Sequence, residues 1–445
     1  MRNIWEFSHA ARLVKTTLML AVLASPFSVQ AKDEGVNGAL YIQTNEITNV
    51  IIHYARKNNG KLVEIERIAT GGKGSGTFKE IDGLESAPNA FEGVGSVILS
   101  SDHHNLFATN GGDNSVSSFK VGDDGALTLV DVKPSGQAVI GRSGSAKSLA
   151  YSSKNGVLYV AHSYGPDHIH LFNVKKDGKL ELRADHYAVN TPTKTDRIPS
   201  QIVLSPDGNY LMADILLDRR PLNPDGSSTF VLANEIDKDG LAIFPVKADG
   251  GLGTPRFVDS GGVVPFAITF LNNSKDTFIN AIGGSGGLVL GKIDSNGNVT
   301  NAPIVTINQS QGAPSELCWV SITPDNKLAF ATVLGYSYVS SFKIKDGALQ
   351  IAKDPAAPTV PGDGTFRALD NLVSSGPSDS FASPDGKYFY QIYGNASKLV
   401  AYKLNRPSND DDDGDNDNDG EADGSLIEID VQAIPYNGPQ GMAGF

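Results

Sequence analysis

Short apolar strands separated by polar turns recur along most of the chain. Each repeat contains an apolar strand, a tight turn, a second strand that ends in small residues, and a hairpin closed by Asp-Gly or Asn-Gly. The first turn reads Ser205-Pro206-Asp207-Gly208 in one repeat and Ser383-Pro384-Asp385-Gly386 in another, and proline and glycine set the backbone angles that such turns need. Apolar residues alternate on both sides of the hairpin turns, which is a strong signal for paired strands. The pattern predicts an all-β chain.

The second strand of the repeat can be recognised seven times. The seven segments are residues 40–44, 106–109, 158–161, 210–213, 277–280, 329–332 and 388–391. A repeat of about 50 residues with four short strands is typical of a β-propeller, in which each small sheet buries both faces against its neighbours. We therefore expect a seven-bladed β-propeller of four-stranded antiparallel blades.

The first repeat lacks its innermost strand, because it begins directly at the second strand near Leu40. Residues 439–445 resemble the opening of the fifth repeat, residues 265–270. We expect this C-terminal segment to pair into the first blade and close the ring. Closure would also cover a sheet edge that is otherwise exposed.

The first 31 residues differ from the rest of the chain. Arg2, Arg12 and Lys15 precede a short apolar stretch, and residues 29–31 supply small side chains at a cleavage site. This arrangement is typical of a secretory signal peptide. We expect residues 1–31 to be removed and residues 32–445 to form a single periplasmic or secreted domain. The apolar stretch is shorter than the about 20 residues of a membrane span, so no membrane insertion is expected.

Charge and cysteine content narrow the classes of partner. The formal charge of −13 becomes about −15 without the first 31 residues, so nucleic acids and anionic lipids would repel the protein. Cys318 is the one cysteine of the chain, which excludes an intramolecular disulfide. We expect a monomer that binds a small molecule.

Candidate chemistry lies where the second strands end, around one mouth of the central channel. Polar residues occupy these ends in the first four repeats and apolar residues in the last three, which suits a small organic ligand. His162 is expected to act as a general base on water, oriented by Asp214. Arg219 or Arg197 is expected to stabilise an oxyanion or hold a carboxylate. The expected substrate-binding residues are Asn45, Asn110, Asp218, Glu316 and Trp319. Polar residues at strand ends also hydrogen-bond neighbouring blades, so structural roles stay open.

An acidic insert, residues 409–424, replaces the short turn between the third and fourth strands of the last repeat. Asp415, Asp417 and Asp419 alternate before a glycine, and Asp423 follows, so their oxygens are spaced to converge on calcium. Leu426 stands where a helix-loop-helix site needs glutamate. We expect these four aspartates to bind calcium, the alternative being a solvated acidic loop that contacts a protein partner. No cofactor is expected to be required.

The chain resembles the lactonase family of seven-bladed propellers, which includes bacterial 6-phosphogluconolactonases of the propeller type and fungal 3-carboxymuconate cyclases. The resemblance is carried by residues 110–112, 214–219 and 318–325. Two positions depart from the cytosolic lactonases: Ser200 stands in place of a histidine, and Leu216 replaces a glycine. These departures, and the expected export, argue against a phosphorylated sugar lactone as substrate.

The resemblance leaves three functions open. The first is an exported lactonase-like hydrolase that acts on a small organic lactone or ester at the channel mouth. The second is a non-catalytic propeller that binds a ligand or a protein, and the third is a cycloisomerase of unsaturated carboxylates. Propeller catalysts use scattered loop residues without a compact motif, so the sequence does not decide whether the chain is an enzyme.

Overall fold

The computed structural model describes most of the chain from Gly35 to Phe445. The described residues are 35–76, 78–79, 84–85, 93–139, 146–219, 231–235, 238–307, 316–365, 373–407, 420–436 and 438–445, without the side chains of 78, 79, 84, 85 and 219. The expected signal peptide, residues 1–31, lies outside the described residues. The same is true of residues 408–419, which make up most of the acidic insert.

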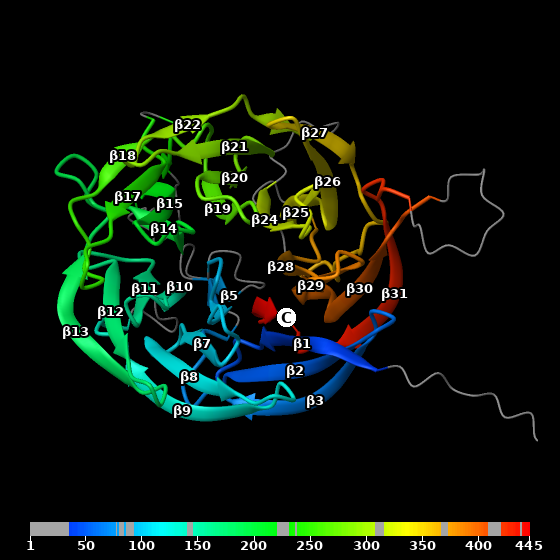
Figure 1. Cartoon of the computed structure of the whole chain (residues 1–445), viewed down its shortest axis with the longest axis horizontal. Coiled ribbons are helices and arrows are strands. Elements are labelled where there is room, and N and C mark those ends of the chain that lie inside the picture. Colours follow the sequence, from blue (N-terminus) through cyan, green and yellow to red (C-terminus); the bar gives the residue numbers. More distant parts are fainter. Residues whose placement is uncertain are drawn as a thin grey trace, which may run out of the picture. The chain divides into compact units, whose positions relative to one another are not determined.

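Seven antiparallel sheets are arranged around a central axis, each with its first strand inside and its last strand at the rim (Figure 1). Blade 1 consists of β32 (Gln440–Gly444), β1 (Val36–Gln43), β2 (Val50–Lys57) and β3 (Leu62–Ala69). Blade 2 consists of β6 (Val97–Leu99), β7 (Asn105–Asn110), β8 (Ser115–Val121) and β9 (Leu127–Pro134). Blade 3 consists of β10 (Ala146–Ser152), β11 (Val157–His162), β12 (Ile169–Val174) and β13 (Leu180–Tyr187).

The remaining blades repeat the same order. Blade 4 consists of β14 (Ile198–Leu204), β15 (Tyr210–Arg219), β17 (Leu241–Pro245) and β18 (Arg256–Val258), with β16 (Val231–Leu232) paired to β15. Blade 5 consists of β19 (Pro265–Phe270), β20 (Thr277–Ile282), β21 (Gly287–Ile293) and β22 (Val299–Asn301), with β23 (Val305–Thr306) paired to β21. Blade 6 consists of β24 (Leu317–Ile322), β25 (Leu328–Val333), β26 (Tyr338–Lys345) and β27 (Ala348–Lys353). Blade 7 consists of β28 (Pro377–Ala382), β29 (Tyr388–Tyr393), β30 (Lys398–Leu404) and β31 (Leu426–Ala433).

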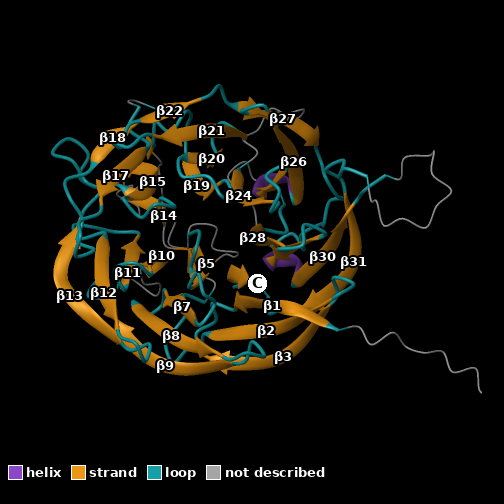
Figure 2. Ribbon diagram, in the orientation of Figure 1, coloured by secondary structure: helices purple, strands orange, loops and turns teal. Residues whose placement is uncertain are grey.

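Little other regular structure is present in the described part. The strands β4 (Phe78–Lys79) and β5 (Leu84–Glu85) pair with each other, and two single-turn 3₁₀ helices, η1 (Leu334–Tyr336) and η2 (Gly394–Ala396), follow β25 and β29 (Figure 2). The expected all-β, seven-bladed architecture is confirmed. Over the described residues, no helix is long and apolar enough to cross a membrane.

The C-terminal strand closes the ring as expected. In the β32–β1 ladder, Met442 lies opposite Ile42 and Ala443 lies opposite Tyr41. The same strand contacts the inner strands of blades 7 and 2. Both ends of the described unit therefore meet in one sheet, and no inner edge of blade 1 is left unpaired.

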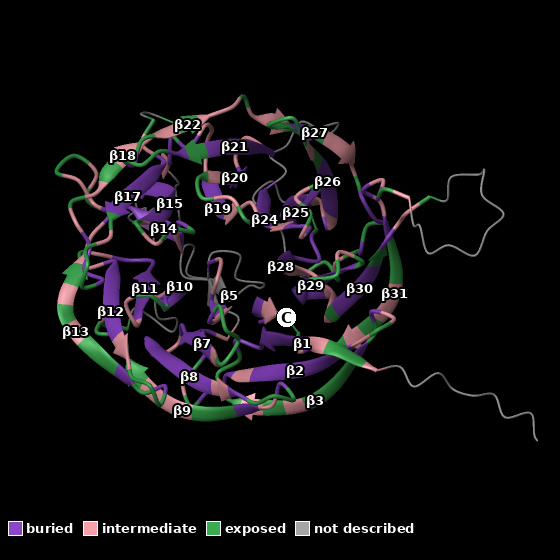
Figure 3. Ribbon diagram, in the orientation of Figure 1, coloured by how far each residue is buried: buried purple, intermediate pink, exposed green. Residues whose placement is uncertain are grey.

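The hydrophobic core lies between the blades (Figure 3). One cluster joins residues of blades 3 and 4, such as Tyr159 and Phe244, and another joins residues of blades 1 and 2, such as Tyr41 and Phe119. Second and third strands are buried on both faces, whereas the outer strands carry exposed residues along their length. A blade is thus stable only between two neighbours.

The turn after each inner strand fixes a common register among blades 4, 6 and 7. In blade 4 the Ser205 hydroxyl donates to Asp207 Oδ1 at 2.7 Å and accepts from the Tyr210 backbone N–H at 3.0 Å. Thr323 and Ser383 make the same contacts in blades 6 and 7. Residues at equal distances before these hydroxyls therefore occupy equivalent places around the channel.

Candidate functional site in the central channel

His162 ends β11 and is fully buried, with both ring nitrogens in use. Nδ1 lies 3.0 Å from the His168 carbonyl oxygen, which can only accept, so Nδ1 carries the proton. Nε2 then accepts from the Ser135 hydroxyl at 2.7 Å. Burial lowers the pKa of His162 to about 3, so the ring is neutral near pH 7. In this arrangement the imidazole has no lone pair left for a water molecule.

Asp214 lies within β15 and is also fully buried, but it points to a different neighbour. Its Oδ1 accepts from the Asn280 side-chain amide of blade 5 at 3.1 Å, whereas His162 contacts Ser135, which follows the last strand of blade 2. The two side chains thus use opposite neighbouring blades. The expected orientation of His162 by Asp214 is therefore wrong in this structure.

Asp214 and Asn280 form a complementary pair if the acid carries a proton. Among the described residues, Asp214 Oδ2 and Asn280 Oδ1 have no hydrogen-bond partner. Burial raises the pKa of Asp214 well above its ordinary value. A proton on Oδ2 would donate to Asn280 Oδ1 and satisfy both atoms at once. We infer that this neutral acid–amide pair joins blades 4 and 5.

The variant Asp214→Asn should make stability less dependent on pH. The pKa of Asp214 is raised in the folded state, so the folded protein binds the extra proton and wild-type stability falls as pH rises above about 4. The asparagine side chain of the variant can still form both hydrogen bonds with Asn280, and it does not titrate. Thermal unfolding should show a smaller loss of Tm between pH 5 and pH 8 in the variant than in the wild type.

The control for this comparison is Asp276→Asn, which makes the same chemical change at an exposed carboxylate of blade 5. It should leave the pH dependence unchanged. An Asp214→Asn protein whose Tm falls with pH as steeply as that of the wild type would show that Asp214 is already ionised.

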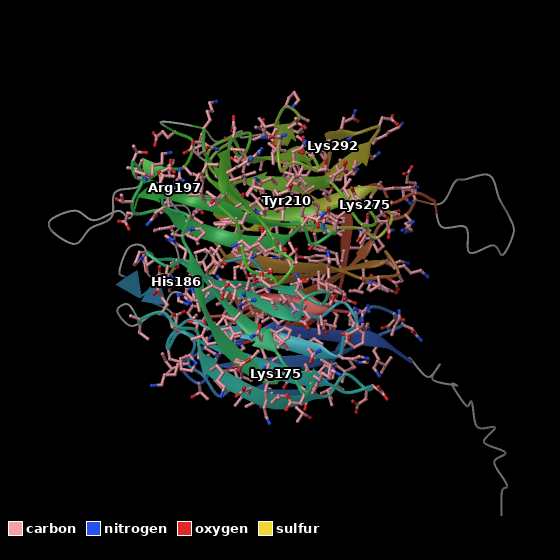
Figure 4. The ribbon with its side chains drawn as sticks, turned by 60° about the vertical axis from the view of Figure 1, so that its left-hand side comes forward. Lys175, His186, Arg197, Tyr210, Lys275 and Lys292 are labelled. Carbon is pink, nitrogen blue, oxygen red and sulfur yellow. The ribbon has the colours of Figure 1, made fainter. Side chains whose placement is uncertain are left out.

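Arg197, labelled in Figure 4, belongs to a partly buried cluster of ionic side chains at the start of blade 4. Its guanidinium donates to Asp239 Oδ2 at 2.5 Å and lies 3.6 Å from Asp218 Oδ1. Lys194 lies 3.1 Å from the other oxygen of Asp218. Two cations and two carboxylates offset one another, which is the arrangement that buried charges require. Arg197 and Asp218 thus bind each other, and the side chain of Arg219 lies outside the described residues.

Asn110 and Asn45 are buried in hydrogen bonds within and between blades. Asn110 Oδ1 accepts from Asn49 at 2.8 Å and from Thr70 at 2.7 Å, and its amide donates to Ser115 and Ser117. Asn45, at φ 53°, exchanges two hydrogen bonds with Ser75. These contacts account for both polar side chains without a ligand.

The remaining predicted residues lie apart from these clusters. Glu316 is buried at φ 49°, and its carbonyl accepts from the Leu334 backbone N–H at 3.0 Å. Asp423 accepts two hydrogen bonds from Ser425 and lies 3.4 Å from Lys353 Nζ. Asp415, Asp417 and Asp419 lie outside the described residues, so calcium binding stays a prediction. In the described part, no cluster of three or more His, Cys, Asp or Glu side chains fits a metal ion.

A pocket of about 330 Å³ lies among the inner strands of blades 6, 7, 1 and 2 and opens to solvent. The residues that line it are Val94, Gly95, Val97, Ile98, Leu99, Trp319, Val320, Asp379, Ser380, Phe381, Met442, Ala443 and Gly444. The lining residues Leu99, Phe381 and Gly444 pair with Leu106, Tyr390 and Leu40 of the second strands. The pocket thus lies along the inner strands, whereas the site was expected where the second strands end. Among the described residues predicted for the site, only Trp319 lines it.

Asp379 is the charged residue of this pocket, and it is 6% exposed. Its Oδ2 accepts from the Gly441 backbone N–H of the closing strand at 2.8 Å. Burial raises the pKa of Asp379 to about 7, although the Gly441 N–H and the Trp319 indole both lower it. A carboxyl group that is half ionised near neutral pH can accept and return a proton.

The Trp319 indole lies beside this carboxyl group. Its N–H lowers the pKa of Asp379, yet it makes no hydrogen bond of standard geometry in the described part. On the other side of Gly441, Ser96 Oγ is so close that a Cβ at Gly441 would come within 2.3 Å of it, and the φ of +80° there also requires glycine. Gly441 thus leaves room for the Ser96 side chain, which is not part of the described pocket lining.

A signal for Asp379 is present in the sequence but was not used. Counting back four residues from the turn hydroxyls Ser205, Thr323 and Ser383 gives Gln201, Trp319 and Asp379. This position lies on an inner strand and faces the channel. Asp379 is the unusual member of the set, because it places a carboxyl group there. The polar residues predicted at the strand ends lie between blades instead.

Comparisons with known proteins agree with this architecture. Residues 37–193 match the family described as Lactonase, 7-bladed beta-propeller. A periplasmic gluconolactonase of Pseudomonas aeruginosa is 14% identical, with 92% of this chain and 98% of that chain covered and a TM-score of 0.61. A putative 6-phosphogluconolactonase from Bacteroides uniformis is 15% identical, with 92% and 99% covered and a TM-score of 0.61.

A protein from Lactobacillus plantarum is also similar, at 14% identity, with 92% of this chain and 100% of that chain covered and a TM-score of 0.62. No curated protein matches the chain. The family match covers the first three blades, and the likeness to solved structures extends the same fold over the other four. The match supports the family resemblance inferred from the sequence over residues 37–193, and the described chain has the fold of a seven-bladed β-propeller.

Proposed function

We propose that this protein is an exported lactonase-like hydrolase whose site is the pocket in the central channel. The observation that carries the proposal is a buried carboxyl group, Asp379, in an open pocket that the Trp319 side chain also lines. The family match supports lactone chemistry. The signal-like segment at residues 1–31 supports export, and the similar gluconolactonase of Pseudomonas aeruginosa is described as periplasmic.

Asp379 would act as the general base. Its carboxylate takes a proton from a water molecule while the water oxygen attacks the lactone carbonyl carbon. The bond between that carbon and the ring oxygen then breaks, and Asp379 returns the proton to the ring oxygen. The product is a hydroxy acid. The same group serves both steps because its pKa lies near the working pH.

The Trp319 indole N–H would stabilise the negative charge on the carbonyl oxygen. It makes no hydrogen bond of standard geometry among the described residues, although it lies close enough to Asp379 to lower the pKa of that group. Such preorganised donors are worth several kcal/mol to the transition state of an acyl transfer, about 3 kcal/mol for one donor.

A binding propeller without catalysis is the second candidate. It is favoured by the contacts of His162 and Asn110, whose polar atoms are used in hydrogen bonds within the protein. The cycloisomerase is disfavoured at this pocket, because its substrates carry several carboxylates and the charged residue of the lining is Asp379.

The test is a panel of γ- and δ-lactones assayed with the purified protein between pH 5 and pH 9. We expect saturable hydrolysis, with kcat/KM rising as pH increases through about 7, because the base must be ionised in the free enzyme. Saturable binding without turnover on any lactone would establish the binding propeller instead and end the hydrolase proposal.

A further inference from the structure

The walls of the channel pocket are almost entirely apolar. Beyond Asp379 and Trp319 they consist of aliphatic side chains, Phe381 and glycine, with Ser380 as the one further polar residue. The Ser380 hydroxyl already lies 2.8 Å from the Ser321 hydroxyl. A ligand therefore finds polar partners at the Asp379 end of the pocket and apolar contact along the rest.

This lining disfavours a sugar lactone. Each sugar hydroxyl that loses water in the pocket needs a hydrogen-bond partner, and the walls near Leu99 and Met442 provide none. A phosphate or carboxylate would also face Asp379 with no lysine or arginine in the lining to offset it. An uncharged ring with a hydrocarbon tail has no hydroxyl groups to leave unpaired and no negative charge to face Asp379.

We propose that the ligand is an uncharged lactone with an aliphatic tail, its ring against Asp379 and Trp319 and its tail along Val97, Phe381 and Met442. The inference rests on the proposed function, because it takes the channel pocket as the site. The pocket volume of about 330 Å³ is at the lower end of the usual range for small-molecule sites, so the tail is short.

The inference is tested with lactams, which keep the ring and resist hydrolysis. Titration calorimetry of the wild-type protein would compare 2-pyrrolidinone with its 5-butyl, 5-hexyl and 5-octyl derivatives and with gluconolactam. We expect affinity to increase about fourfold for each added methylene until the pocket is full, and then to level off. Gluconolactam should not bind measurably.

A variant locates the binding. Ala443→Phe places a ring in the pocket and should abolish binding of the hexyl lactam. Val431→Phe, which adds the same ring to an exposed position of the outer strand β31, should leave the affinity unchanged. If Ala443→Phe does not fold, the titrations of the wild-type protein still test whether affinity depends on the length of the tail.

The outcomes separate this inference from the proposed function. Tail-dependent lactam binding without hydrolysis of any lactone would support the ligand class and overturn the catalytic role. Affinity that does not depend on tail length, tighter binding of gluconolactam, or no lactam binding at all would overturn the ligand class. Hexyl-lactam binding that survives Ala443→Phe in a folded protein would place the site elsewhere and also overturn it.

Discussion

Asp379→Asn should lower kcat/KM for lactone hydrolysis by about 100- to 10,000-fold, the usual contribution of a general base. The amide keeps the shape of the carboxyl group and can still accept from the Gly441 backbone N–H. It cannot take a proton from water. Steady-state kinetics at pH 8 on the best lactone of the panel would measure the loss, together with KM, which should change little.

The fold should survive this substitution. Burial of Asp379 favours its neutral form, so wild-type stability falls as pH rises from about 4 to about 7, and the amide avoids that loss. The variant should therefore unfold at the same Tm as the wild type or higher at pH 8. Asp276→Asn, at an exposed position of blade 5, should retain full activity. Full activity of Asp379→Asn would remove Asp379 from the mechanism.

A chain that ends at Pro439 should lose at least about 3 kcal/mol of stability. The missing segment supplies β32, which closes the ring against β1. Its last residue also binds Arg56, because the Phe445 carbonyl oxygen accepts from Arg56 Nε at 3.1 Å and from Arg56 Nη2 at 2.5 Å. Arg56 is 1% exposed and would keep the Asn37 carbonyl oxygen as a partner at 2.8 Å, so the loss should lie near the lower end of the about 3–5 kcal/mol that breaking a buried ionic contact costs.

Denaturant unfolding of the truncated chain would measure this loss of stability. Two point variants would show how much of it comes from the contact between Arg56 and Phe445. Arg56→Met should be strongly destabilising in the full chain but much less so in the truncated chain, because part of the interaction is already missing there. Arg67→Met removes an exposed guanidinium paired with Glu64 at 2.8 Å and should change stability by less than about 1 kcal/mol. Unfolding of the truncated chain at the wild-type midpoint would show that ring closure contributes nothing.

The architecture could be predicted from the sequence because its signals are local. The turns at Ser205 and Ser383 are held by hydrogen bonds among their own residues. The sequence Ser-Pro-Asp-Gly therefore gives the same turn in both blades. The missing inner strand at Leu40 then required a partner, and residues 439–445 were the remaining segment of the right kind. Repetition supplied the topology without any knowledge of long-range contacts.

The site could be predicted only in part, because polar residues at strand ends have two uses. Asn110 and His162 are at strand ends, as expected, and Asp214 lies within the longer strand β15, yet each is hydrogen-bonded between blades. The sequence contains no signal for which neighbour a side chain faces. Residues 140–145, 308–315 and 366–372, which precede β10, β24 and β28 in the sequence, lie outside the described residues.

Asp379 was missed because its surroundings come from three blades. Gly441 and Trp319 are far from Asp379 in sequence and meet it only when the ring closes. Its elevated pKa is a property of that assembled environment. Alignment of the inner strands on their turns would have identified the position, but not its pKa.

The most direct test of the channel as the site is a crystal structure of the wild-type protein with 5-hexyl-2-pyrrolidinone bound. The lactam ring should contact Asp379 and Trp319, and the hexyl chain should lie along Phe381 and Met442. A lactam bound instead beside the ends of β7 and β11 would contradict both the proposed site and the role of Asp379.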